Sequence, residues 1–178
     1  ERGFAGCDNL EKVTIGKGVI TIERSAFADC KLLTTITIPK NVSSIGECPF
    51  DGCSSLTNII VDKDNQYYIN DEYGVLYNKD KTLLVQYPIG NTRTSYAIPE
   101  GVTTIGDSAF YNCTTLTSIT LPDSLKIIER SAFSGCDGIT SLVIPDGVTT
   151  IGQSAIRDCD SLRDITIPDT VTTIDGYA

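Results

Sequence analysis

One phrase of the sequence returns every 23 residues, and this step constrains the fold more than any other feature. The segment GDSAFYNCTTLTSITLP at 106–122 comes back as ERSAFSGCDGITSLVIP at 129–145. In each copy a cysteine follows three residues after an aromatic residue or its substitute. That position is held by Phe4, Phe27, Phe50, Phe110, Phe133 and Ile156. A fixed period of this length is typical of a repeat protein, in which each unit is one supersecondary element.

The residues of one unit predict a coil with two short strands. Ile119 stands between Ser118 and Thr120, the alternation of a half-buried strand. Pro122 ends this strand because proline lacks the N–H that a ladder needs. A second alternation, at 148–151 in the next unit, runs back on the opposite side, and the SAF segment then closes the coil as a turn of tight helix. One coil buries too little apolar surface to offset its ordering, so neighbouring coils must stack into a solenoid.

The cysteines follow the same period, which predicts a column of buried free thiols. Cysteine behaves in a core as a small hydrophobe, and parallel side chains one coil apart do not place their Cβ atoms for a disulfide. Cys48 lies outside the period and is interpreted as a local substitution; the alternatives are a functional thiol or a link to Cys53. The periodic thiols are Cys7, Cys30, Cys53, Cys113, Cys136 and Cys159.

Three segments of the chain, IPDGVTTIGQSAI, IPEGVTTIGDSAF and ITIPKNVSSIG, resemble the BspA-like class of bacterial leucine-rich repeats. The resemblance covers nearly the whole chain. It implies a leucine-rich repeat solenoid of right-handed coils, with a parallel β-sheet on the concave face and short strands and tight helical turns on the other side. It also implies an extracellular or cell-surface location and a role in adhesion to host proteins or other cells. It brings no shared catalytic residues.

The repeat is interrupted once, because the step from Phe50 to Phe110 is too long for one unit. We expect one solenoid over 1–178, with first repeats at 1–61, a Tyr-rich insertion or variant coil at 62–97, and last repeats at 98–178. The insertion is predicted to contain a hairpin with GVLY and TLLVQYP as strands and NKDK as the connecting turn. Both chain ends fall inside a unit, so the array is expected to continue into further repeats or domains.

Six of the eight tyrosines lie in this insertion. Tyrosine provides contact area at low entropic cost in recognition surfaces, and it equally fills small cores. We expect Tyr77, Tyr87 and Tyr96 to pack inside. Tyr67, Tyr68 and Tyr73 are candidate ligand-binding residues.

Charge and composition exclude several functions. The formal net charge of −9 repels nucleic acid and anionic membranes. Without histidine there is no Ser-His-Asp or Cys-His arrangement, and the abundant carboxylates are explained by solvation. Asp62 and Asp64 resemble the start of a calcium loop, but the glycine and the terminal glutamate of that motif are missing. We therefore expect no enzyme activity, no cofactor, no metal and no membrane insertion in this segment.

The outward residues of the first strand form two columns, which we take as the candidate binding face. Exposed threonine also simply suits a strand. The hypothesis is a non-catalytic extracellular module that binds protein or glycan; the alternatives are a rigid structural spacer, or an accessory region of a larger surface or secreted protein whose activity lies elsewhere. The candidate residues on this face are Thr35, Thr37, Asn58, Ile60, Ser118, Thr120, Ser141, Val143, Asp164 and Thr166.

Overall fold

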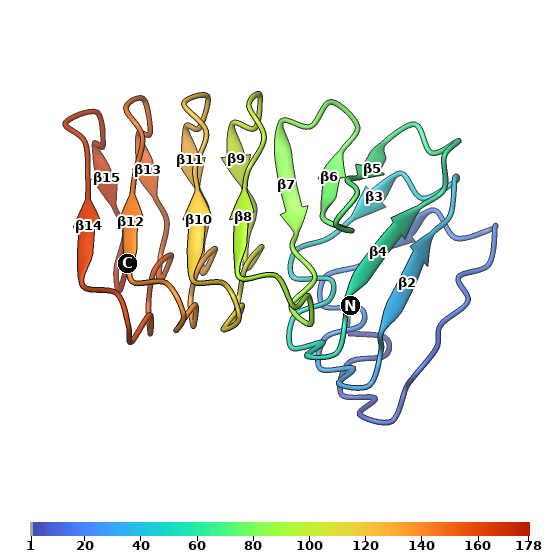
Figure 1. Ribbon diagram of the computed structural model, residues 1–178. Coiled ribbons are helices and arrows are strands. Elements are labelled where there is room, and N and C mark those ends of the chain that lie inside the picture. The colour runs from blue at the N-terminus through green and yellow to red at the C-terminus, as the bar shows by residue number, and fades with distance from the viewer. Residues whose placement is uncertain (1) are drawn as a thin grey trace. The chain divides into compact units, whose positions relative to one another are not determined.

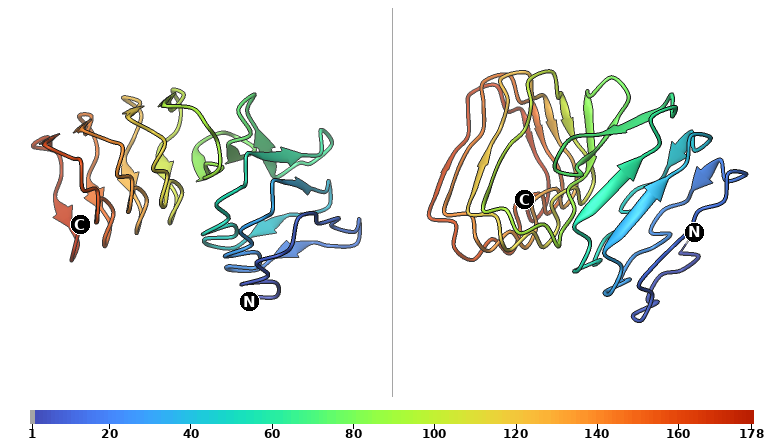
Figure 2. Two further views of the ribbon diagram at one scale, coloured as in Figure 1. Left: turned by 60° about the horizontal axis from the view of Figure 1, so that its bottom comes forward. Right: turned by 45° about the vertical axis from the view of Figure 1, so that its right-hand side comes forward.

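The structure, a computed structural model, describes residues 2–178 and separates into two compact units (Figure 1). The first unit ends at Asn91 and the second runs from Thr92 to Ala178. Regular structure in the described residues consists of strands. These residues form no helix that is long and apolar enough to cross a membrane. Each unit is a stack of coils, as the 23-residue step predicts; the stacked strands of the second unit are seen in Figure 2.

Each regular coil carries two strands, and each strand pairs in parallel with its equivalent one repeat away. The first strands are β2 (Thr35–Ile38), β4 (Asn58–Val61), β8 (Ser95–Ala97), β10 (Ser118–Thr120), β12 (Ser141–Val143) and β14 (Asp164–Thr166). The second strands are β1 (Thr21–Ile22), β3 (Ser44–Ile45), β9 (Thr104–Ile105), β11 (Ile127–Ile128), β13 (Thr150–Ile151) and β15 (Thr173–Ile174).

The pairing keeps the repeat register in both units. In the first unit β2 pairs with β4 and β1 with β3. In the second unit β8 pairs with β10, β12 with β14, and β9, β11, β13 and β15 form one parallel ladder. Thr35 lies beside Asn58 and Ile127 beside Thr150, so equivalent residues of successive coils are neighbours in space.

The segment that closes each coil is a series of turns, so the expected turn of tight helix is wrong. Ser108 and Asn112 have φ values of 55° and 56°, in the left-handed region. A left-handed residue at every fourth position interrupts the i to i−4 hydrogen bonds of a helix. Instead, the N–H groups of Ser108 and Asn112 donate to the carbonyls of Arg130 (2.9 Å) and Ser134 (2.8 Å) in the next coil. Stacking thus supplies partners that a helix would have found within itself.

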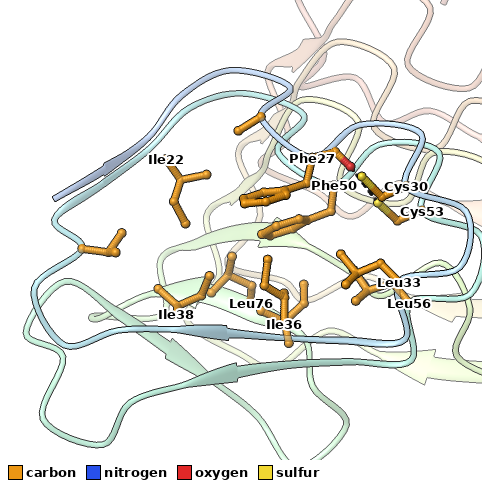
Figure 3. Packing of buried hydrophobic residues seen from close by; sticks show 13 residues of the cluster. Ile22, Phe27, Cys30, Leu33, Ile36, Ile38, Phe50, Cys53, Leu56 and Leu76 are labelled. Atoms are coloured by element: carbon orange, nitrogen blue, oxygen red, sulfur yellow. Dashed lines mark hydrogen bonds between the residues drawn. The ribbon is translucent and has the colours of Figure 1, made fainter. Parts of the chain in front are cut away.

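The core is built from columns of identical residue types. The rings of Phe27 and Phe50 stack with centroids 6.0 Å apart, and those of Phe110 and Phe133 with centroids 5.2 Å apart. Figure 3 shows the first of these stacks beside the side chains of Cys30 and Cys53, with the leucines of the next column below them. Burial of one side chain therefore depends on the coil above and below it.

The insertion forms an antiparallel meander of β5 (Tyr68–Asn70), β6 (Leu76–Asn78) and β7 (Leu83–Gln86). The predicted hairpin, with its turn at NKDK, is confirmed, and β5 is an additional strand. The Asn78 side chain holds the turn: its Oδ1 accepts the Leu83 N–H at 2.9 Å and its Nδ2 donates to Thr82 Oγ1 at 2.8 Å. The meander lies within the first unit.

Candidate ligand-binding surfaces

The structure places the predicted outward residues side by side. Thr37 lies opposite Ile60 in the first unit, and Val143 opposite Thr166 in the second. Ile60 is 40% exposed and Val143 is 66% exposed. Both belong to the column that also holds Thr37, Thr120 and Thr166, so this one column displays apolar side chains among hydroxyls. An exposed β-branched apolar residue in the middle of a polar column offers a contact point to a partner.

Two parts of the predicted columns differ from the expectation. Lys12 and Thr14, which the 23-residue step places one repeat before Thr35 and Thr37, do not belong to a strand, although Val13 and Ile15 still pack against the core. Asn58 is only half exposed, because Gly74 of the insertion lies against it. The two residues are so close that a Cβ atom at position 74 would collide with Asn58. The variant coil in turn contributes β8, whose Ser95 and Ala97 lie beside Ser118 and Thr120 and extend the face of the second unit by one strand.

The insertion also covers one edge of β4. The Ile59 N–H donates to the Gly74 carbonyl at 3.3 Å, and the Val61 N–H donates to Asn70 Oδ1 at 2.8 Å. These groups would otherwise pair with a strand of the next regular coil. In the first unit the parallel ladder of first strands therefore ends at β4.

The tyrosines divide into buried and surface groups. Tyr77 and Tyr87 are fully buried and Tyr96 is 4% exposed, which confirms the expected packing. Tyr67 is 53% exposed, and Tyr73 is half-buried. Tyr68 is half-buried as well, and its hydroxyl accepts the Ile45 N–H at 2.8 Å, so this side chain fastens the insertion to β3. Desolvation raises the pKa of the Tyr68 phenol.

Sequence reasoning missed Asn65, which organises the start of the insertion. Position 65 is one repeat after Val42, and a valine or leucine fills this core position in the regular coils. Asn65 is fully buried, and its Nδ2 donates to the carbonyls of Pro39 (2.8 Å) and Val42 (3.0 Å). Its Oδ1 accepts the N–H groups of Tyr67 and Tyr68, both at 2.8 Å. The one signal in the sequence was an amide at a core position of the repeat.

All seven cysteines are free. Of the periodic thiols, Cys30, Cys53, Cys113 and Cys136 are buried as expected, whereas Cys159 is half-buried and Cys7 is exposed. The Cys53 thiol donates to the Phe27 carbonyl at 3.0 Å, and the Cys136 thiol donates to the Phe110 carbonyl at 3.1 Å. Burial raises the pKa of the Cys53 thiol to about 12, and it also raises the pKa of Cys136. A thiol must be protonated to donate this hydrogen bond, so the structure gives the buried Cys53 and Cys136 thiols a structural role.

The segment that starts at Asp62 and resembles the beginning of a calcium loop forms a local turn. Asp62 Oδ1 accepts the N–H of Asp64 at 2.9 Å, which forms a local turn. Within residues 2–178, His, Cys, Asp and Glu side chains nowhere gather in the groups of three or more that a metal ion would need.

The coil, the strand pairing and the aromatic and thiol columns define a leucine-rich repeat solenoid. The family model described as "BspA type Leucine rich repeat region" matches residues 1–78 and 90–178 with six copies, so the chain belongs to the BspA-type leucine-rich repeat family. A comparison with curated protein sequences finds no match.

Solved structures of similar proteins agree with this assignment. A leucine-rich repeat protein from Eubacterium ventriosum is 27% identical with a TM-score of 0.79, over 99% of this chain and 59% of its own. A leucine rich cell surface protein from Faecalibacterium prausnitzii is 32% identical with a TM-score of 0.73, over 93% and 50%. The pneumococcal vaccine antigen PcpA is 27% identical with a TM-score of 0.73, over 88% and 44%. The chain thus spans about half the length of these proteins.

Proposed function

We propose that the chain is a non-catalytic interaction module of an extracellular or cell-surface protein, and that it binds protein or glycan ligands through its first-strand face or its insertion. The observation that carries this proposal is the exposure of Ile60 and Val143 among the outward residues of the first strands. Core packing does not require these two residues, since their neighbours along the strands fill the core. Contact with a partner gives them a role.

Two further findings support the proposal. The similar proteins include one described as a cell surface protein and one described as a vaccine antigen, and both descriptions agree with a protein exposed outside the cell. The buried thiols with raised pKa are structural, and the family is typical of interaction modules rather than enzymes. Adhesion to host or other cells follows as the biological role of such binding.

The test is a pull-down from host extracellular proteins together with a glycan array, using the chain and two variants. Thr120→Arg with Val143→Arg places bulky charged groups on the first-strand face. Tyr67→Ser with Tyr73→Ser alters the insertion and leaves the Tyr68 contact in place. We expect one of the two variants to lose the ligand.

A matched control carries Ile127→Arg and Thr173→Arg. These exposed residues lie on the second strands β11 and β15, outside the proposed binding face. If this control lost the ligand as fully as the other variants, general disruption would be the cause. No binding by the unaltered chain would overturn the proposal and favour a rigid spacer, which the hydrogen bonds between successive coils also allow.

A further inference from the structure

One position of the repeat carries charges of opposite sign in the two units. It is the residue in the turn after the first strand, directly after proline in most coils. In the first unit it is Lys17, Lys40 and Lys63, each 23 residues after the last; in the second unit it is always acidic. All seven side chains are exposed. The acidic residues are Glu100, Asp123, Asp146 and Asp169.

The lysines of the first unit form a stacked column. The side chain of Asn41 donates to the Lys17 carbonyl at 2.6 Å, which ties the turns of two successive coils together. Neighbouring parallel strands lie about 4.8 Å apart, so the turns that carry these lysines are stacked as well, and like charges at equivalent positions repel one another. Within the described part of the chain, no ion pair joins Lys17, Lys40 or Lys63 to a carboxylate. An anion that bridges successive lysines would relieve this repulsion.

Lys17 and Lys40 line an open groove of about 820 Å³. This volume lies within the range of about 300–1,000 Å³ typical of small-molecule sites. Tyr67 and Ile20 also line the groove, and they are 53% and 61% exposed. Ser43 and Gln66 add a hydroxyl and an amide, which can donate to and accept from a ligand rich in hydroxyl groups.

We propose that this groove binds an acidic oligosaccharide, with Lys17 and Lys40 on successive anionic groups and the Tyr67 ring against the apolar face of a sugar. The inference rests on the proposed function and names a ligand class for it. Ammonium groups bind carboxylate and sulfate as point charges without a fixed geometry, which suits a ligand with repeated charges.

An acidic peptide fits the groove less well. Extended peptides commonly add to a free strand edge through backbone hydrogen bonds. The lining residues Lys17, Lys40, Asp64 and Tyr67 lie in turns and bends, not along a strand edge. Side-chain hydroxyls, amides and a tyrosine ring remain as the recognition elements, and these match a sugar.

Asp64 gives the sharpest test, because it is a carboxylate among the lining residues and its negative charge would repel an anionic ligand. Binding is measured by calorimetry at low and at physiological salt with oligogalacturonate and a heparin-derived hexasaccharide as carboxylated and sulfated probes. Asp64→Asn should tighten the affinity by about twofold to fivefold. Lys17→Gln with Lys40→Gln should weaken it by about tenfold, and salt should weaken it in the unaltered chain.

The controls separate charge at the groove from charge in general. Lys31→Gln with Lys126→Gln removes the same charge from exposed positions outside the groove and should leave the affinity unchanged. A neutral hexasaccharide should not bind. The inference is overturned if neither acidic probe binds, if a hexaglutamate peptide binds as tightly, or if both double lysine variants lose affinity equally. Each of these results leaves the pull-down test of the first-strand face and the insertion standing on its own.

Discussion

Asn65 occupies the core position that Val42 holds one coil earlier, and its side-chain amide donates to the Val42 carbonyl at 3.0 Å. A single exchange of valine for asparagine thus keeps the contact between two coils and changes its chemistry. The same side chain also accepts two N–H groups from the chain beyond it. The regular repeat stops and the insertion begins at this residue.

Asn65→Ala should lower the free energy of unfolding by about 2–4 kcal/mol, because it leaves buried backbone donors and acceptors without partners. Urea unfolding followed by circular dichroism measures the change. Asn41→Ala removes an exposed amide that donates a hydrogen bond to the Lys17 carbonyl, and it should cost no more than about 1 kcal/mol. Equal effects of the two substitutions would contradict the organising role of Asn65.

Tyr68→Phe removes the hydroxyl that accepts the Ile45 N–H, and we expect it to cost about 1 kcal/mol. Hydrogen exchange gives a local readout: the Ile45 amide should exchange faster in this variant. Tyr67→Phe should leave both stability and the Ile45 amide unchanged, since its ring is 53% exposed. If the Ile45 amide exchanged at the same rate in Tyr68→Phe and in the unaltered chain, the Tyr68 hydroxyl would not hold the insertion against β3.

The buried thiols predict a loss of stability at alkaline pH. Burial raises the pKa of Cys53 from 9.0 to about 12, so near pH 9 and above the unfolded chain releases a proton that the folded chain retains. The contribution of the buried thiols to the free energy of unfolding is complete well below pH 9. It declines as the pH rises, by less than about 1 kcal/mol per thiol up to pH 9.5. Urea midpoints between pH 7.5 and 9.5 test this.

A Cys113 variant tests whether the thiols cause the pH effect. Burial also raises the pKa of the Cys113 thiol strongly. Cys113→Ala lowers the stability at every pH because it leaves a cavity, but it should also make the decline with pH shallower by the share of one thiol. A slope identical to that of the unaltered chain would show that the thiols are not the source.

Gly135 has a φ of 72°, and the side chain of Asn112 from the preceding coil occupies the space that its Cβ would need. Gly135→Ala should therefore cost about 1–3 kcal/mol through backbone strain and this contact. Asn112→Ala in the same chain should recover part of the loss. Strict additivity of the two changes in urea unfolding would show that the residues do not compete for space.

Much of the fold follows from the sequence because a repeat reports each structural position several times. The alternation around Ile119 predicted a strand, and parallel stacking then fixed the register of every equivalent strand. The spacing of Phe110 and Cys113 likewise predicted the aromatic and thiol columns. Averaging over copies removes the ambiguity that a single short apolar run would carry.

Features that appear once, or that depend on backbone conformation, were harder to predict. Serine is not typical of the left-handed region, so Ser108 gave no sign that the closing segment is a series of turns; the cause is the partner that the next coil offers. Asn65 and β5 lie in the unrepeated insertion, where no second copy supports an interpretation. The charged turn positions from Lys17 to Asp169 are visible in the sequence, but the groove that Lys17 and Lys40 line together is visible only in the structure.

The hydrogen bonds from the closing segment of one coil to the next use the same atoms in every regular coil. Deletion or duplication of one 23-residue segment within a regular stretch therefore rejoins each donor with an equivalent acceptor. A change of 22 or 24 residues would mispair the whole junction. Unequal recombination between neighbouring copies in the gene can thus change the length of the array in whole steps and still yield a chain that folds, so the reach of the protein is open to rapid variation.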